Sequence, residues 1–202
     1  MDEGPEILFG IYCPPHPQPL LSPDENSGYR KLRESFELCK TRIEESDADI
    51  ILVYSTTWPS IVGHQIQAHP NPTWTHVDDD FHYLGSMPYS FKIDADFAEK
   101  YMECCKDRGL HSRTVAYDGF PIDTGSIVAL KLLNPGNKIP ACIVSSNMYA
   151  NRAETIVLGK AARDAIKYQK KKAVVVVVSS PVSYTHLRAH ETPEQLGWRR
   201  GR

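Results

Sequence analysis

The sequence lacks three features that would place the protein in a specialised class. It has no apolar run near the roughly 20 residues that a membrane-spanning helix needs, and its longest run is AVVVVV at 173–178. The first residues, MDEGPEILFG, are acidic and contain no apolar signal region. A formal net charge of −2, with both signs interspersed, gives no electrostatic footprint for nucleic acid or an anionic membrane. We therefore expect no nucleic-acid and no membrane partner.

Paired cysteine motifs are also lacking. The chain has 5 cysteines, an odd number, and no CxxC spacing. This pattern is typical of free, mostly buried thiols in a reducing compartment. We expect a cytoplasmic protein and no reactive thiol, including at the adjacent Cys104 and Cys105.

What the sequence does contain is an alternation of strand and helix patterns. Apolar residues recur at helical spacing at Tyr29, Leu32, Phe36, Cys39 and Ile43, and Ser27 is placed to cap that helix. The expected strands cover residues 6–13, 48–55, 138–146 and 173–180, and the expected helices cover 27–47, 94–110, a short segment from 123, and 151–172. This alternation predicts an α/β fold with a largely parallel sheet flanked by helices.

The stretch 56–92 shows no regular period and is expected to be a long loop. It contains His64, His69, His76 and His82. Loops of this length in compact domains are usually functional or disordered. The acidic run 78–80 has no ligand spacing and is interpreted as a solvated loop.

The last 22 residues do not continue the pattern. Residues 181–202 show neither strand nor helix period, and VSYTHLRAHET resembles a translated cloning or sequencing adapter. We therefore expect residues 1–180 to be an incomplete domain and 181–202 a non-native tail. Loss of the later strands would expose a hydrophobic edge at 173–178, which predicts poor solubility.

The segment after the first strand, CPPHP, holds a histidine on a stiff loop. Prolines restrict φ around His16, and ligands of parallel sheets bind at the carboxyl ends of strands. Two histidines and a carboxylate would form the facial triad of non-haem Fe(II) oxygenases. At the second strand end, however, Thr56 and Thr57 stand where a histidine would be needed, and His64 lies seven residues further on as a possible substitute.

Several motifs, in order, carry a family resemblance over roughly residues 5–180. They are PPHPQPLL, ILVYSTTW followed by GH, FPIDTG, IPACIVSSN, and LGKAARDAI followed by AVVVVVSS. The chain resembles class III extradiol ring-cleavage dioxygenases, the LigB-like family, and among them most the alpha-type subunits of aminophenol-cleaving enzymes.

The resemblance implies an incomplete iron site. His16 occupies the position of an Fe(II) ligand, whereas Thr57 occupies the position of the second ligand histidine, just before Trp58. Threonine is a poor Fe(II) ligand beside imidazole and carboxylate. The family's acid–base histidine and ligand glutamate fall in or beyond the tail, and neither His186 nor Glu191 is assigned to these roles.

Three functions remain open at this stage. The first is a non-catalytic alpha-type subunit of an Fe(II) extradiol dioxygenase, with no catalytic residues of its own. Its iron would lie in a related beta-type partner of a hetero-oligomer that cleaves 2-aminophenol or a related aromatic with O₂. The second is an active dioxygenase that uses His16, His64 and a distal carboxylate. The third is a scaffold or binding module without an oxygenase partner. Substrate-binding residues are not identified, although Asn147 and Tyr149 could line a cleft.

Overall fold

The computed structural model describes residues 6–179, and the expected foreign tail at 181–202 lies outside these residues. The described elements are, in chain order, β1 (Glu6–Cys13), α1 (Gln18–Leu21), η1 (Pro23–Glu25), α2 (Ser27–Glu44), β2 (Ile50–Ser60), β3 (His64–Gln67), β4 (Thr73–His76), η2 (His82–Leu84), β5 (Met87–Ser90), α3 (Ala95–Asp107), β6 (Ser112–Val115), α4 (Thr124–Leu133), β7 (Ala141–Asn147), α5 (Arg152–Gln169) and β8 (Lys172–Val178). No helix among residues 6–179 has the length and apolar character needed to cross a membrane.

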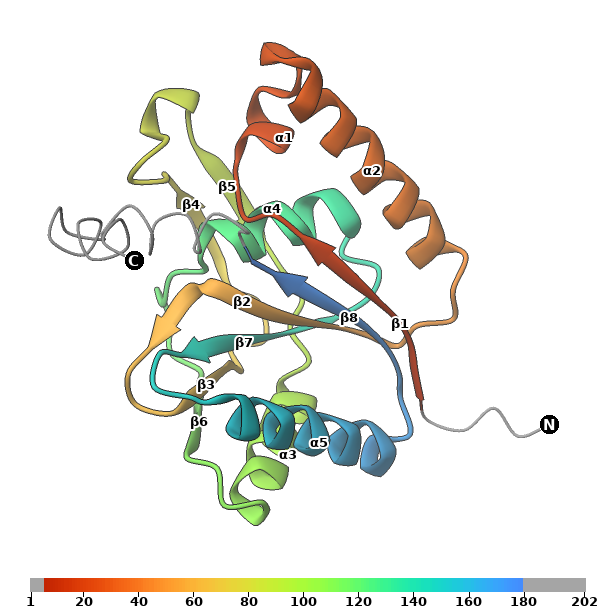
Figure 1. Cartoon of the computed structure of the whole chain (residues 1–202), viewed down its shortest axis with the longest axis vertical. Coiled ribbons are helices and arrows are strands. Elements are labelled where there is room, and N and C mark those ends of the chain that lie inside the picture. The colour runs from red at the N-terminus through yellow and green to blue at the C-terminus, as the bar shows by residue number, and fades with distance from the viewer. Residues whose placement is uncertain (1–5, 180–202) are drawn as a thin grey trace, which may run out of the picture.

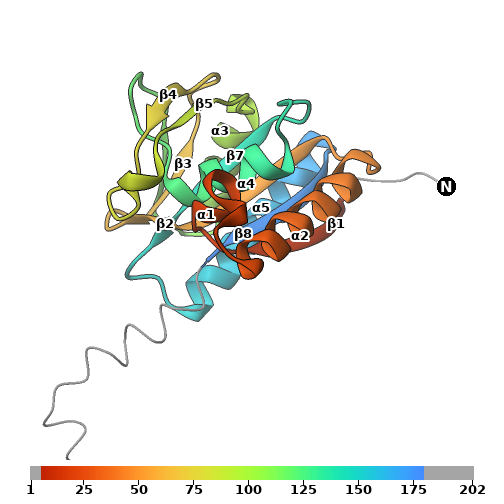
Figure 2. The same ribbon diagram turned by 90° about the horizontal axis from the view of Figure 1, so that it is seen from above.

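The centre of the molecule is a six-stranded sheet in the order β1-β8-β2-β7-β3-β6. The pairs β1–β8, β8–β2, β2–β7 and β3–β6 are parallel, and β3 runs antiparallel to β7. Helices α1, α2 and α4 cover one face, and α3 and α5 cover the other (Figures 1 and 2). The predicted α/β class with a largely parallel sheet is confirmed.

Two hydrophobic clusters lie on the two faces of this sheet. Alternate residues of β2 enter different clusters, since Ile51 and Val53 pack on the α2/α4 side while Ile50 and Leu52 pack on the α3/α5 side. Such continuous apolar runs are typical of strands that are covered on both faces. The strands expected at 48–55, 138–146 and 173–180 correspond to β2, β7 and β8, although β2 begins at Ile50, β7 begins at Ala141, and residue 180 lies outside the described residues.

The predicted exposed edge at 173–178 is wrong, because β8 lies between β1 and β2. Val174, Val176 and Val178 are fully buried. Strand order depends on pairing between segments that are distant in the sequence. The local sequence around β8 therefore does not indicate that this strand pairs with β1. The edge strand on this side is β1.

The expected loop at 56–92 is also wrong in large part. β2 continues to Ser60, and β3, β4, η2 and β5 follow within the stretch. β4 and β5 form a separate two-stranded antiparallel sheet. Strands of four residues are too short to show a reliable period, which explains why the pattern read as irregular.

Helix ends follow local capping chemistry. Asp94 accepts a hydrogen bond from Phe97 N at the start of α3, as predicted. Gly109, with φ of +78°, follows the end of the same helix. The cap of α2 is Asn26 rather than Ser27, since the Asn26 side chain accepts hydrogen bonds from the amides of residues 28 and 29. Ser27 is instead the first helical residue.

Candidate functional site at the strand carboxyl ends

The loop after β1 places His16 at the carboxyl edge of the sheet. His16 is half-buried, and its ring meets Phe81 edge-on at a centroid distance of 6.2 Å. Pro17 caps α1, and Pro19 lies in its first turn. The prolines fix the backbone on both sides of His16, so the loop is held by its own stereochemistry as well as by packing.

Thr57 lies on the α4 side of the same edge, where its hydroxyl donates a hydrogen bond to a carboxylate. Thr57 Oγ1 and Ser55 Oγ each donate to Asp123 Oδ2 at 2.6 Å. Asp123 is the N-cap of α4, and the same oxygen accepts from Ser126 N at 2.9 Å. Asp123 Oδ1 is buried without a hydrogen-bond partner among the described residues. Thr57 therefore belongs to a hydrogen-bonded cluster built around Asp123.

Gly125 brings three chain segments together at this cluster. A Cβ at this position would lie 2.5 Å from Thr57 Oγ1, 2.6 Å from Val178 Cγ1 and 3.0 Å from Pro15 Cβ. The ends of β2 and β8 and the loop beside His16 thus pack against the first turn of α4. Only glycine permits this approach without displacing a neighbour.

The segment from β4 to η2 closes over the same region. His76 Nε2 lies 2.8 Å from Thr124 Oγ1, which donates to Asp78 Oδ2. Asp78 Oδ1 accepts from the amides of Asp80 and Phe81. Asp78 therefore orders a turn, while Asp79 and Asp80 are exposed, as the solvated-loop interpretation predicted.

The residues present do not fit a facial-triad iron site. Among residues 6–179, no group of three or more His, Cys, Asp or Glu side chains is arranged to hold a metal ion. A non-haem Fe(II) centre needs two imidazoles and a carboxylate around one point. His16 is the one histidine that the resemblance places there, and the Thr57 hydroxyl is committed to Asp123. We therefore derive no reaction step at this edge.

His64 lies on the opposite face of the sheet from Thr57. It begins β3, is 2% exposed, and lines a cleft together with residues of α5. Its Nε2 lies 3.4 Å from Glu154 Oε1, but neither ring nitrogen makes a hydrogen bond of good geometry within the described residues. Burial lowers the pKa of His64, and the Glu154 carboxylate opposes that effect. The structure does not bring His64 and His16 to one site.

Acidification is expected to destabilise the protein through His64. Its folded-state pKa lies below its ordinary value of 6.5 because burial disfavours the imidazolium. The unfolded chain then binds a proton that the folded chain does not. The free energy of unfolding should fall as the pH drops below about 6.5 and level off below the folded-state pKa. Urea denaturation between about pH 5 and 7.5 should show this dependence reduced in His64→Gln. An identical pH dependence in both proteins would contradict it.

The cysteines have the properties that the sequence predicts. All five cysteines are free, and burial raises the pKa of Cys13 and of Cys105 to about 12, as expected for unreactive thiols.

Asn147 does line the cleft beside His64, whereas Tyr149 is 79% exposed and does not. The central residues Asp123 and Gly125 were not identified as site residues. The motif FPIDTG contained them, but only as the start of a helix.

Comparisons with known proteins identify relatives of the chain. A family model described as the catalytic LigB subunit of aromatic ring-opening dioxygenase matches residues 10–194. The 2-aminophenol 1,6-dioxygenase alpha subunit of a Pseudomonas species is 31% identical over 173 residues, covering 85% of this chain and 64% of that protein. The corresponding beta subunit is 31% identical over 203 residues, covering 93% of this chain and 65% of that protein. The chain thus spans about two thirds of the length of these relatives.

A solved structure shows the same fold. An uncharacterized protein, JW3007, from Escherichia coli K12 aligns with a TM-score of 0.52 and 16% sequence identity. The alignment covers 73% of this chain and 52% of that chain. At this identity the likeness concerns the fold alone. The family is shown by the match over residues 10–194: the chain belongs to the LigB family of aromatic ring-opening dioxygenase subunits.

Proposed function

We propose that this chain is the non-catalytic, alpha-type subunit of an extradiol dioxygenase that cleaves 2-aminophenol or a related aromatic. The observation that carries the proposal is Thr57. It stands where the resemblance places a ligand histidine, and a threonine hydroxyl is a poor Fe(II) ligand beside imidazole and carboxylate. In the structure this hydroxyl donates to Asp123. A related beta-type subunit, in a cytoplasmic hetero-oligomer, would hold Fe(II) and insert both atoms of O₂ next to the substituted ring carbon.

Expression with and without the partner tests this proposal. The chain alone is expected to show no ring cleavage with 2-aminophenol, Fe(II) and O₂, and co-expression with the beta-type subunit of its native host should give a complex with activity. Ring opening can be followed by the absorbance of the product. Ring cleavage by the isolated chain would contradict the proposal. Failure to copurify with any beta-type subunit would favour a scaffold without an oxygenase partner.

The altered-site alternative has its own test. An active enzyme using His16, His64 and a distal carboxylate should lose its iron in His64→Ala. The position of His64 on the α5 face, opposite the Thr57 cluster, does not favour that site. An iron content that falls in this variant would restore the alternative.

We also propose that residues 181–202 are a non-native tail on an incomplete domain, although the family match continues to residue 194. Sequencing the genomic template across codon 180 tests this. A reading frame that continues with an α/β pattern would support the proposal, and the tail as written would refute it.

A further inference from the structure

We propose that the α5-side surface of β1 and β8 is the docking site of the segment that follows β8 in the complete chain. That segment forms a helix beside α5 and then a strand beside β1. The docking site consists of Ile7, Gly10, Tyr12, Val175 and Val177. The assignment rests on the proposal that residues 181–202 replace the natural continuation of the domain. About a third of each Pseudomonas relative lies outside the match, which is longer than one helix and one strand.

The strand register shows which side chains of β1 lie on the α5 side. Gly10 pairs with Val175, and Tyr12 pairs with Val177, in the parallel β1–β8 ladder. Residues that are directly paired project on the same side of a sheet. Val175 and Val177 line the cleft beside α5, so Gly10 and Tyr12 also face that side. The intervening Ile11 packs against the cluster on the α2/α4 side.

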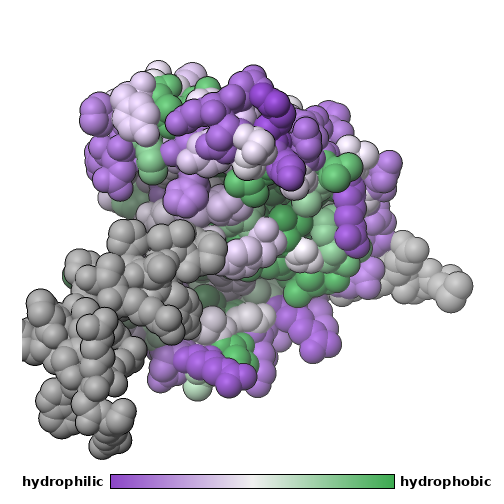
Figure 3. All heavy atoms as spheres, turned by 45° about the horizontal axis from the view of Figure 1, so that its top comes forward, coloured by the Kyte–Doolittle hydropathy of each residue, from purple (hydrophilic) through white to green (hydrophobic). Residues whose placement is uncertain are grey.

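The docking site is apolar and is only partly covered. Ile7 is 47% exposed and Tyr12 is 62% exposed, and Val175 and Val177 are half-buried. Cys13, on the other face of β1, is 3% exposed. Figure 3 shows a band of hydrophobic residues across the middle of the visible face, between more hydrophilic parts. Helices normally cover both faces of parallel strands, so a covering element is absent here among the described residues.

The handedness of strand connections places the covering helix on the α5 side. The connection from β7 to β8 runs along the sheet toward β1, and its helix α5 lies on that side (Figures 1 and 2). The connection from β1 to β2 runs the opposite way, and its helix α2 lies on the opposite face. Connections between parallel strands are almost always right-handed. A strand added at the β1 edge after β8 would therefore be reached through a helix beside α5.

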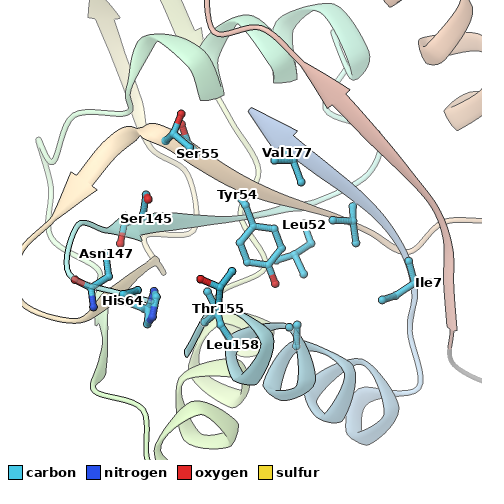
Figure 4. A pocket seen from close by; sticks show the side chains of 16 residues that line it. Ile7, Leu52, Tyr54, Ser55, His64, Ser145, Asn147, Thr155, Leu158 and Val177 are labelled. Atoms are coloured by element: carbon cyan, nitrogen blue, oxygen red, sulfur yellow. The ribbon is translucent and has the colours of Figure 1, made fainter. Parts of the chain in front are cut away.

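The cleft beside α5 has room for the side chains of such a helix. Its volume is about 440 Å³, and Ile7 lies at its β1 end (Figure 4). Leu158, Gly159 and Ala162 line it on the α5 side. Glycine is unfavourable inside a helix, and a Cβ at Gly159 would meet no atom within 4 Å. No contact among the described residues therefore requires this glycine, whereas small residues permit the close approach of a second helix.

Substitution of Gly159 in two lengths of the protein tests the docked helix. In the 202-residue chain, Gly159→Leu should raise the urea midpoint, because leucine is the better helix former and its Cβ meets open space. In the complete chain, made from the genomic reading frame, the same substitution should lower the midpoint, because leucine would overpack the contact with the docked helix. Lys160→Leu, at an exposed position of α5 outside the cleft, should shift the midpoint equally in both lengths. An equal effect of Gly159→Leu in both lengths would overturn the proposal.

Hydrogen exchange at β1 tests the added strand and needs no variant. Among the described strands β1 pairs only with β8, so the amides on its other edge have no strand partner. They should exchange rapidly in the 202-residue chain and be protected in the complete chain at every protein concentration. Protection that appears only at high concentration would assign the edge to a second copy. That result, or rapid exchange in the complete chain, would overturn the proposal.

Failure of the docking site can be distinguished from failure of the function proposed above, because neither experiment needs iron or a beta-type subunit. A reading frame that continues past codon 180, with β1 unprotected in its product, would overturn the docking site alone. A frame that ends in the tail as written would overturn both the docking site and the incomplete domain. Neither outcome would change the expected absence of ring cleavage by the isolated chain.

Discussion

Replacing Gly125 with alanine is expected to destabilise the protein by about 2–3 kcal/mol, because overpacking of a tight site forces side chains and backbone to shift. The new Cβ would lie 2.5 Å from Thr57 Oγ1 and 2.6 Å from Val178 Cγ1. Neither neighbour can move freely, since Thr57 is bonded to Asp123 and Val178 is fully buried in β8. Urea denaturation followed by circular dichroism measures the effect.

Gly159→Ala provides the matched control, because it makes the same chemical change in another helix. Its Cβ would meet nothing within 4 Å, and alanine is favoured over glycine inside a helix by roughly 0.5–1 kcal/mol. The two substitutions should therefore change the free energy of unfolding in opposite directions. If Gly125→Ala is as stable as the wild type, the first turn of α4 does not pack as closely against the strand ends as described.

The second large loss of stability is expected when Asp123 is replaced. Its carboxylate caps α4 through Ser126 N and also accepts from the hydroxyls of Ser55 and Thr57. Asp123→Ala should lose about 1 kcal/mol for the cap and a further 1–3 kcal/mol, roughly, for the two hydrogen bonds that Asp123 accepts from the Ser55 and Thr57 hydroxyls. The expected total is about 2–4 kcal/mol in urea denaturation.

Asp123→Asn is the corresponding control. Asparagine is as good an N-cap as aspartate and keeps one acceptor oxygen, so it should cost less than half of the alanine effect. Equal losses in the two variants would show that the negative charge, rather than the hydrogen-bond geometry, holds the cluster together. A negligible loss in both would contradict the cluster itself.

Much of the fold could be predicted because it depends on local patterns. The helical spacing of Phe36 and Ile43 and the apolar runs of β2, β7 and β8 record how each segment is buried. Pairing is different. The place of β8 between β1 and β2 joins residues more than a hundred positions apart, and no local pattern contains that information. Short strands such as β3 and β6 fail for the opposite reason, since four residues show too little of a period.

The candidate site was predictable in part. Proline stereochemistry drew attention to His16, and Thr57 was noticed as the wrong residue type for a metal ligand. Its actual partner, Asp123, lies 66 positions away in sequence, and the sequence predicts for it only the start of a helix. Gly63, directly before His64, has a φ of +75°, and its Cβ position is filled by His111 O. Such tertiary contacts cannot be deduced from the order of residues alone.

Iron stoichiometry in the assembled hetero-oligomer tests the central claim most directly. The complex of this chain with its beta-type subunit, purified without oxygen and saturated with Fe(II), should contain one iron per pair of subunits by elemental analysis. His16→Ala in this chain should leave that value unchanged, because Thr57 and Asp123 leave no complete ligand set beside His16. Two irons per pair, or loss of iron in His16→Ala, would contradict the account and would make this chain a metal-binding subunit.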